Sequence, residues 1–377
     1  MRVYLDNAAT TPLDEEVLDA MLPVLKDGFG NPSSTHSYGR KIKSLIERAR
    51  KNVAKHINCT PGEIFFTSGG TEADNMAIRC AVKDLGVKHI VTSTIEHHAV
   101  GHTIDRLKAK GLVDVTYVHL DENGHVDLQH LDQILSTSAK TLVSLMHANN
   151  EVANLLPLDR VSEICQKHGA VFHSDTVQTM AHYRFDMQLL EQVHFLACSA
   201  HKFHGPKGVG FLYVNKSVQI NPLIHGGSQE RNMRGGTENV YGIVGLSKAM
   251  DVAFKDLDTH QAHVMDLKSY MIERLNNSIV GVKYNADSSS MDNSLYTVLS
   301  VSLPPTDIAP MMLFNMDIMG VACSGGSACT SGSNIGSHVL EGIDAPNDRP
   351  TIRFSFSRFN TKEEIDYAVD CLVKLYS

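Results

Sequence analysis

Short apolar runs alternate with helical patterns along residues 40–214, and this alternation constrains the fold more than any other feature of the chain. Apolar runs predict strands at seven places: 63–67, 89–93, 113–119, 141–146, 170–173, 193–198 and 208–214. Residues 40–57 and 158–167, among others, have the spacing of amphipathic helices. Parallel strands need such crossover helices, because a tight turn cannot connect them. The sequence therefore predicts an α/β fold with a mostly parallel, seven-stranded sheet.

The pattern changes after about residue 257. Strands are predicted at 297–302, 318–322 and 351–357, and longer polar or helical pieces separate them. The last helix begins near Thr361 and Glu364, whose spacing is typical of a capping box. We therefore expect a large α/β domain over 15–257 and a smaller α+β domain over 258–377.

The composition argues against several classes of protein. The 377 residues include 34 Lys and Arg and 42 Asp and Glu, and the formal charge of −8 argues against general nucleic-acid binding. No apolar run reaches the roughly 18 residues of a membrane span, and we see no signal peptide. Seven scattered cysteines do not suggest a disulfide framework. We expect a protein of the reducing cytoplasm, without membrane or nucleic acid as a direct partner.

Candidate site residues follow the predicted strands, where open α/β sheets bind their ligands. Gly69-Gly70-Thr71-Glu72 precedes a helical stretch and suits a phosphate, although such a segment is more often only a turn. Asp175 follows the strand at 170–173 and is either a helix N-cap or a partner for a cationic ligand group. Lys202 is either a solvated lysine or a Schiff-base lysine. Together the three segments provide what pyridoxal phosphate (PLP) requires.

The twenty histidines do not form a metal-binding motif. No H-E-x-x-H occurs, and no C-x-x-C pair exists to build a zinc site. We therefore predict no metal centre.

A loop at 323–333 contains only Gly, Ser, Ala, Thr and Cys. Such a segment cannot pack a core, so we expect a flexible, exposed loop. Exposed thiols without a function are uncommon on natural surfaces, which favours a functional role for Cys329. Cys323 lies at a predicted strand end, where burial is the simpler explanation and a secondary sulfur acceptor the alternative.

Several ordered motifs resemble one known family over essentially the whole chain. The chief motifs are Tyr4–Thr11, Gly30–Ser34, Thr67–Glu72, Glu96-His97, His147–Glu151, Asp175–Gln178, Ser199–Lys202, Arg234–Thr237, Ser327–Cys329 and Ile352–Ser355. The chain resembles the cysteine desulfurases of the class V aminotransferases, which are PLP enzymes of fold type I. Residues 324–338 are similar to the members with a long catalytic loop. The resemblance also implies that residues 1–14 join the smaller domain.

The resemblance implies a role for individual residues around PLP. Lys202 would form the Schiff base, Asp175 would pair with the pyridinium nitrogen, and His97 would stack on the ring and donate a proton. Residues near the phenolic oxygen would be Asn150 and Gln178. Residues of the phosphate cradle would be Gly70, Thr71, Ser199 and His201. Thr237 would reach the phosphate of a second subunit, which implies a homodimer with shared sites.

The resemblance also implies the reaction. Arg353, with Asn150, would bind the carboxylate of L-cysteine, and Cys329 would take its sulfur as a persulfide and release L-alanine. The sulfur would pass to an acceptor protein, such as an iron–sulfur scaffold or a thiolation relay. Alternatives are a selenocysteine lyase, an ordinary aminotransferase and a catalytically silent scaffold. The cysteine loop disfavours the aminotransferase, and the presence of Lys202, Asp175 and Cys329 disfavours the scaffold.

Overall fold

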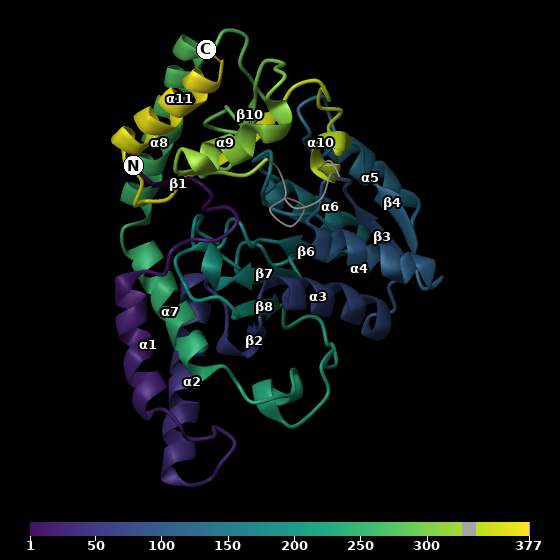
Figure 1. Ribbon diagram of the computed structural model, residues 1–377. Coiled ribbons are helices and arrows are strands. Elements are labelled where there is room, and N and C mark those ends of the chain that lie inside the picture. Colours follow the sequence, from purple (N-terminus) through teal and green to yellow (C-terminus); the bar gives the residue numbers. More distant parts are fainter. Residues whose placement is uncertain (326–336, 377) are drawn as a thin grey trace.

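A seven-stranded sheet forms the centre of the larger part of the molecule in the computed structural model, which describes residues 1–325 and 337–376 (Figure 1). Its strands run in the order β2 (Ile64–Thr67), β8 (Gly210–Val214), β7 (Phe195–Ser199), β6 (Val171–Asp175), β5 (Thr141–Ser144), β3 (His89–Thr92) and β4 (Asp114–Tyr117). Only β8 is antiparallel to its neighbours β2 and β7. The predicted α/β class and mostly parallel sheet are confirmed, and each strand end lies within two residues of its predicted position.

Helices cover both faces of this sheet, because each face buries its own apolar cluster. The helices are α1 (Glu15–Asp27), α2 (Ser37–His56), α3 (Gly70–Asp84), α4 (His98–Ala109), α5 (Leu128–Thr137), α6 (Leu158–His168) and α7 (Val240–Lys255). The predicted apolar stripe of α2 is buried, with Ile42 1% and Val53 0% exposed. The helix periodicity in the sequence therefore identified the side that packs on the sheet.

A smaller antiparallel sheet lies beyond α7. It has the order β12 (Thr351–Ser355), β10 (Val298–Ser302) and β9 (Lys283–Tyr284), and its helices are α8 (Leu257–Ser278), α9 (Met312–Ile318), α10 (His338–Gly342) and α11 (Lys362–Tyr376). The capping box predicted for the last helix is present: Thr361 N donates to Glu364 and Glu364 N donates to Thr361 Oγ1. The strand predicted at 318–322 is wrong in part, because Met312 and Met316 bury one face of a helix that continues to Ile318.

The N-terminal segment packs with the smaller sheet. β1 (Val3–Tyr4) pairs in parallel with β11 (Val321–Ala322), and Val3 and Leu5 belong to the same apolar cluster as residues of α8 and α11. Because this cluster is separate from those of the large sheet, we propose the division into 1–14, 15–257 and 258–377 as the domain organisation.

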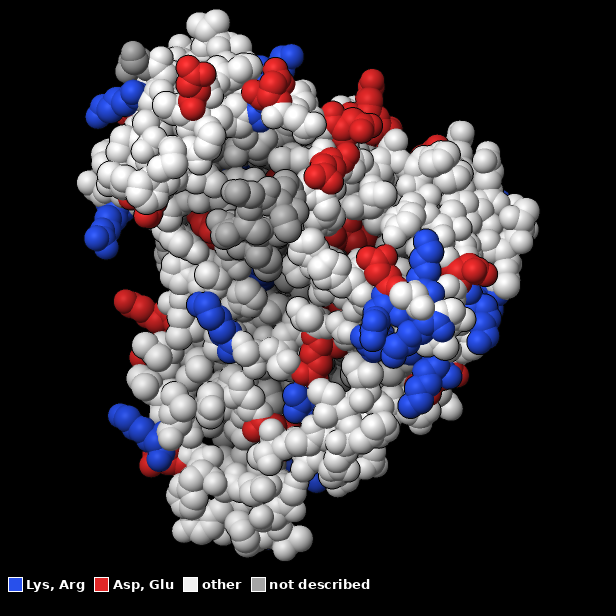
Figure 2. Space-filling model, turned by 45° about the vertical axis from the view of Figure 1, so that its right-hand side comes forward, with Lys and Arg blue, Asp and Glu red and all other residues white. Residues whose placement is uncertain are grey.

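Basic side chains gather at one place on the surface. Lys83 lies in the last turn of α3, and Arg106 and Lys108 lie in the last turn of α4. Figure 2 shows Lys and Arg side chains grouped on this face. Cations at helix C-termini are stabilised by the helix dipole. This effect accounts for the basic group, so no binding partner needs to be inferred from it. Among the described helices, none is long and apolar enough to cross a membrane.

Candidate active site

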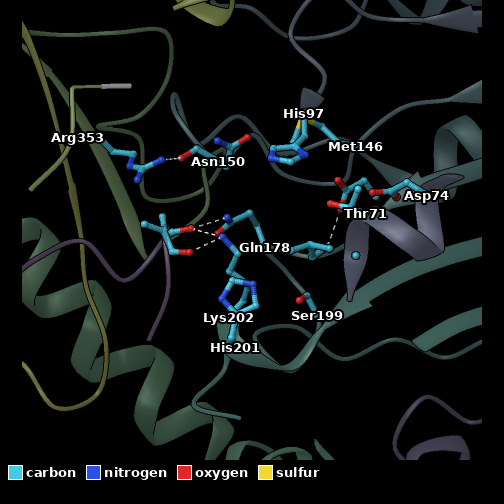
Figure 3. Close-up of a pocket in the computed structure, with 15 residues that line it drawn as sticks. Thr71, Asp74, His97, Met146, Asn150, Gln178, Ser199, His201, Lys202 and Arg353 are labelled. Carbon is cyan, nitrogen blue, oxygen red and sulfur yellow. Dashed lines mark hydrogen bonds between the residues drawn. The ribbon is translucent and has the colours of Figure 1, made fainter. Parts of the chain in front are cut away.

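A cavity of about 250 Å³ lies where the segments after β2, β3, β5, β6 and β7 meet β12 and the N-terminal segment (Figure 3). The structure brings most of the predicted site residues to its wall: Gly70, Thr71, His97, Asn150, Asp175, Gln178, Ser199, His201, Lys202 and Arg353. Five other lining residues have no role predicted from the sequence: Ala8, Ala9, Asp74, Met146 and Val177. Ala8, Ala9 and Val177 lie within quoted motifs, whereas nothing in the local pattern marks Asp74 or Met146.

Asp175 is the last residue of β6, not a residue beyond the strand as expected. Its Oδ1 accepts a hydrogen bond of 2.9 Å from Val177 N, in a turn that starts no helix. Burial raises the pKa of Asp175 to about 6, and the Val177 hydrogen bond and the charge of Lys202 act in the opposite direction. A cationic ligand group in the cavity would favour the ionised carboxylate still further.

Lys202 ends the short 3₁₀ helix η2 (Ala200–Lys202) that follows β7. Its Nζ donates to the carbonyl oxygens of Ala8, at 2.5 Å, and Ala9, at 3.0 Å. Gln178 Nε2 donates to the same Ala8 oxygen at 3.0 Å. The backbone of the N-terminal segment therefore holds the lysine amine at the wall of the cavity.

The start of α3 presents backbone N–H groups to the cavity. Gly69 has φ of +149°, a conformation that favours glycine, and Gly70 begins the helix. A Cβ atom on Gly70 would lie 2.5 Å from Cγ2 of Val177, so any larger residue here would force Val177 to shift. The first amides of a helix lack partners within the helix and carry positive partial charge. This end of the cavity therefore suits a phosphate group, with the hydroxyls of Thr71 and Ser199 on its wall.

His97 is the N-cap residue of α4, and its Nδ1 accepts a hydrogen bond of 3.1 Å from Ala99 N. Burial lowers the pKa of His97 to about 4, and the charges of Lys202 and His338 act in the same direction. The imidazole is thus neutral near pH 7, and because Nδ1 is an acceptor, Nε2 carries the proton. His97 is therefore a hydrogen-bond donor toward the cavity.

Arg353 lies on β12 with 1% of its side chain exposed. Its Nη1 donates to Asn150 O and its Nη2 to Asp6 Oδ1, each at 2.8 Å. The guanidinium therefore brings a positive charge from the smaller domain to the wall of the cavity, opposite the large-domain residues.

Among the predicted site residues that the structure describes, Thr237 is not in the wall of the cavity. Thr237 lines a separate depression together with Arg234 and Asn239, and Cys329 lies outside the described residues. Burial raises the pKa of the Cys323 thiol to about 12, with a further contribution from Asp6. Cys323 is half-buried, and its thiol stays protonated near pH 7, which disfavours the alternative role as a sulfur acceptor.

The residues of the cavity fit PLP. A lysine amine lies beside a buried carboxylate, and a helix N-terminus with glycine at its start is available for the phosphate. Asp74 Oδ1 is buried 3.3 Å from His173 Nε2, and the two atoms do not meet the geometry of a hydrogen bond. Burial raises the pKa of Asp74 well above its ordinary value, and Asp175 and Glu96 contribute further, so a cationic ring nitrogen would relieve the crowding of negative charge. No group of three metal-ligating side chains occurs within residues 1–325 and 337–376.

The family described as Aminotransferase class-V matches residues 3–368, so the chain belongs to the class-V aminotransferase family. Its similarity extends to particular members. It is 43% identical to "Cysteine desulfurase IscS" of Dictyoglomus turgidum over 377 residues, covering 99% of this chain and 94% of that protein. It is 42% identical to "Putative cysteine desulfurase IscS 1" of Bacillus subtilis over 97% of this chain and 96% of that protein. These relatives confirm the resemblance to cysteine desulfurases.

Solved structures give the same result. A structure titled "NIFS-LIKE PROTEIN" superposes with a TM-score of 0.91 at 37% identity and covers 100% of this chain and 99% of that chain. Another, titled "SspA in complex with cysteine", superposes with a TM-score of 0.81 at 32% identity, covering 95% of this chain and 100% of that chain. The predicted fold family is therefore confirmed.

Proposed function

We propose that this chain is a PLP-dependent cysteine desulfurase that takes the sulfur of L-cysteine and releases L-alanine. One observation carries the proposal: the amine of Lys202, the buried carboxylate of Asp175 and the guanidinium of Arg353 line one cavity, although the sequence separates them widely. The cofactor supplies an aldehyde and an electron-accepting ring. The rest of the chemistry belongs to side chains of this chain.

Each side chain has a distinct task in this proposal. Lys202 would hold the cofactor covalently through its amine and would take the proton from the substrate's Cα. Asp175 would keep the ring nitrogen protonated. The residues that would bind the cofactor phosphate are Gly70, Thr71, Ser199 and His201, and those that would contact the ring are His97, Asn150 and Gln178. His97 donates from Nε2, and Arg353 binds the substrate carboxylate through a planar guanidinium suited to that group.

Cys329 is the proposed sulfur carrier. Its thiolate attacks the sulfur of the substrate, so that an S–S bond forms while the Cβ–S bond breaks. The electron pair of the broken bond stays with carbon, which takes up a proton and leaves as L-alanine. The sulfur remains on Cys329 as a persulfide for transfer to an acceptor protein, such as an iron–sulfur scaffold or a thiolation relay.

The Cys329→Ala variant tests this proposal, with Cys323→Ala as its matched control six positions away. C329A should retain the visible absorbance of bound PLP and its change on addition of L-cysteine, yet release no alanine and form no persulfide. C323A should keep both products, because its thiol is protonated at neutral pH. Undiminished alanine release by C329A would contradict the proposal. Parallel assays with selenocysteine distinguish a dedicated selenocysteine lyase.

A homodimer with shared sites is also part of the proposal. Apolar side chains are exposed along α1 and after it, with Leu18 41%, Leu25 50% and Phe29 78% exposed, and such a surface favours association. Thr237 lies away from this chain's own cavity, which supports its proposed contact with the phosphate of a second subunit. Sedimentation of the holoenzyme should give the mass of a dimer, and T237A should weaken PLP binding. We place the enzyme in the cytoplasm, since its described cysteines are free thiols.

A further inference from the structure

Arg353 has a hydrogen-bond donor that the described chain leaves without an acceptor. Its Nη1 and Nη2 are bound by Asn150 O and Asp6 Oδ1, but its Nε is buried and has no partner within residues 1–325 and 337–376. Leaving a buried charged donor without an acceptor costs free energy. Because Arg353 also lines the cavity, a ligand carboxylate is the acceptor that this edge of the guanidinium suits.

Asp6 is held in place by its own backbone, not by Arg353 alone. Its carbonyl oxygen accepts hydrogen bonds from Ala9 N at 3.0 Å and from the hydroxyl of Tyr4 at 3.2 Å. Its backbone also forms an isolated β-bridge with Ser355 of β12. Its side chain is 18% exposed, so its charge is only partly screened by water. No other carboxylate within the described ranges lies at ion-pair distance from Arg353.

We propose that Asp6 is the resident counter-ion of Arg353 and that it sets how strongly the cavity binds a ligand carboxylate. The inference rests on the proposed function, because it takes Arg353 as the group that binds the substrate carboxylate. Asp6 neutralises the guanidinium before the substrate arrives and keeps one oxygen on Nη2 afterwards. The two carboxylates then share one cation and repel each other, so Asp6 is a positioning residue that lowers substrate affinity.

The test compares two ligands in the C329A holoenzyme, which cannot transfer sulfur. L-cysteine and cysteamine carry the same amine and thiol, but cysteamine lacks the carboxylate. Their dissociation constants are measured from the change in absorbance of the bound cofactor. Asp6→Asn keeps an oxygen for Nη2 while removing the charge. We expect D6N to bind L-cysteine about tenfold more tightly, the size expected for one partly screened charge, and to leave cysteamine unchanged.

Asp14→Asn is the matched control. Asp14 lies in the same N-terminal segment and pairs with Arg358, the two side chains being 11% and 12% exposed, but neither lines the cavity. Asn also preserves the N-cap that Asp14 provides to α1. D14N should therefore keep the parent ratio of cysteine to cysteamine affinity.

Thermal unfolding gives a second readout that does not depend on turnover. Without ligand, D6N should melt at a lower temperature than its parent, because Arg353 loses its counter-ion, and L-cysteine should raise the midpoint more than in the parent. Asp6→Ser removes the same charge with a smaller side chain and replaces D6N if D6N does not fold. An unchanged or lower cysteine-to-cysteamine affinity ratio in the folded variant overturns the inference. If the parent itself binds the two ligands equally, the clamp role of Arg353 in the proposed function fails as well.

Discussion

Replacing Glu230 with glutamine should lower the free energy of unfolding by about 3–5 kcal/mol. Arg50 and Glu230 form a two-pronged ion pair at 2.8 and 2.7 Å, and both side chains are 2% exposed. Phe66 N donates to Glu230 Oε2 at 2.8 Å as well. The carboxylate thus faces donors on both oxygens, so the amide of Gln would turn its own N–H groups toward a donor. The charge of Arg50 would then be balanced only by Glu47, whose carboxylate lies 3.2 Å from Arg50 Nε and is 43% exposed.

The local backbone adds to this expected cost. Glu230, Arg231 and Asn232 all have positive φ, at 46°, 56° and 66°, in the short helix η3 (Gln229–Asn232). Non-glycine residues rarely adopt this conformation, and it persists only where surrounding contacts hold it. The Arg50 pair is such a contact, so its loss should also release this segment, which leads to Thr237.

Equilibrium urea unfolding of the holoenzyme measures the effect, with Asp258→Asn as the control. Asp258 binds Arg184 Nη2 through both oxygens at 2.9 Å, but the side chains are 80% and 61% exposed. Solvent screening limits such a pair to about 1 kcal/mol or less. If E230Q costs no more than D258N, burial does not govern the strength of these pairs and the reasoning is refuted.

Three further predictions concern the site and the smaller domain. H97N keeps a cap on α4 and H97F loses it, so H97F should be less stable by about 1 kcal/mol in urea unfolding. Both variants lack the Nε2 donor and should release alanine slowly, and rapid release by either would contradict the role of His97 as a hydrogen-bond donor. G70A should weaken PLP binding in a fluorescence titration, because its Cβ would meet Val177 at 2.5 Å, and V177A should restore it; a G70A protein with native affinity refutes this steric argument. Burial lowers the pKa of Lys268 to about 7 from its ordinary value of 10.5. Between these two pH values the unfolded chain binds more protons than the folded chain, so the free energy of unfolding should rise with pH in this range. K268M should lack that rise in urea unfolding, and identical pH profiles for the two proteins would exclude this role of Lys268.

The sequence predicted the fold class and most of the cavity wall, because both follow from local information. Strand and helix periodicities separated the seven strands from their helices, and family motifs pointed to Lys202, Asp175 and Arg353. Exact ends were less accurate: Asp175 belongs to β6 itself, and Ile318 belongs to α9. A short apolar run has similar composition in a buried strand and a buried helix, so periodicity could not separate them near residue 318.

Only the tertiary structure decided which chemically suited groups meet. The antiparallel direction of β8 has no local signature, because a buried strand looks alike in either direction. Lys202 donates to carbonyls 194 and 193 positions away, and Asp6 pairs with Arg353 across 347 positions. The sequence determines each residue's chemistry and local conformation, whereas these pairings result from the packing of the N-terminal segment between two separate cores. That packing brings the carboxylate of Asp6 to Arg353, a pairing that no motif spacing could have predicted.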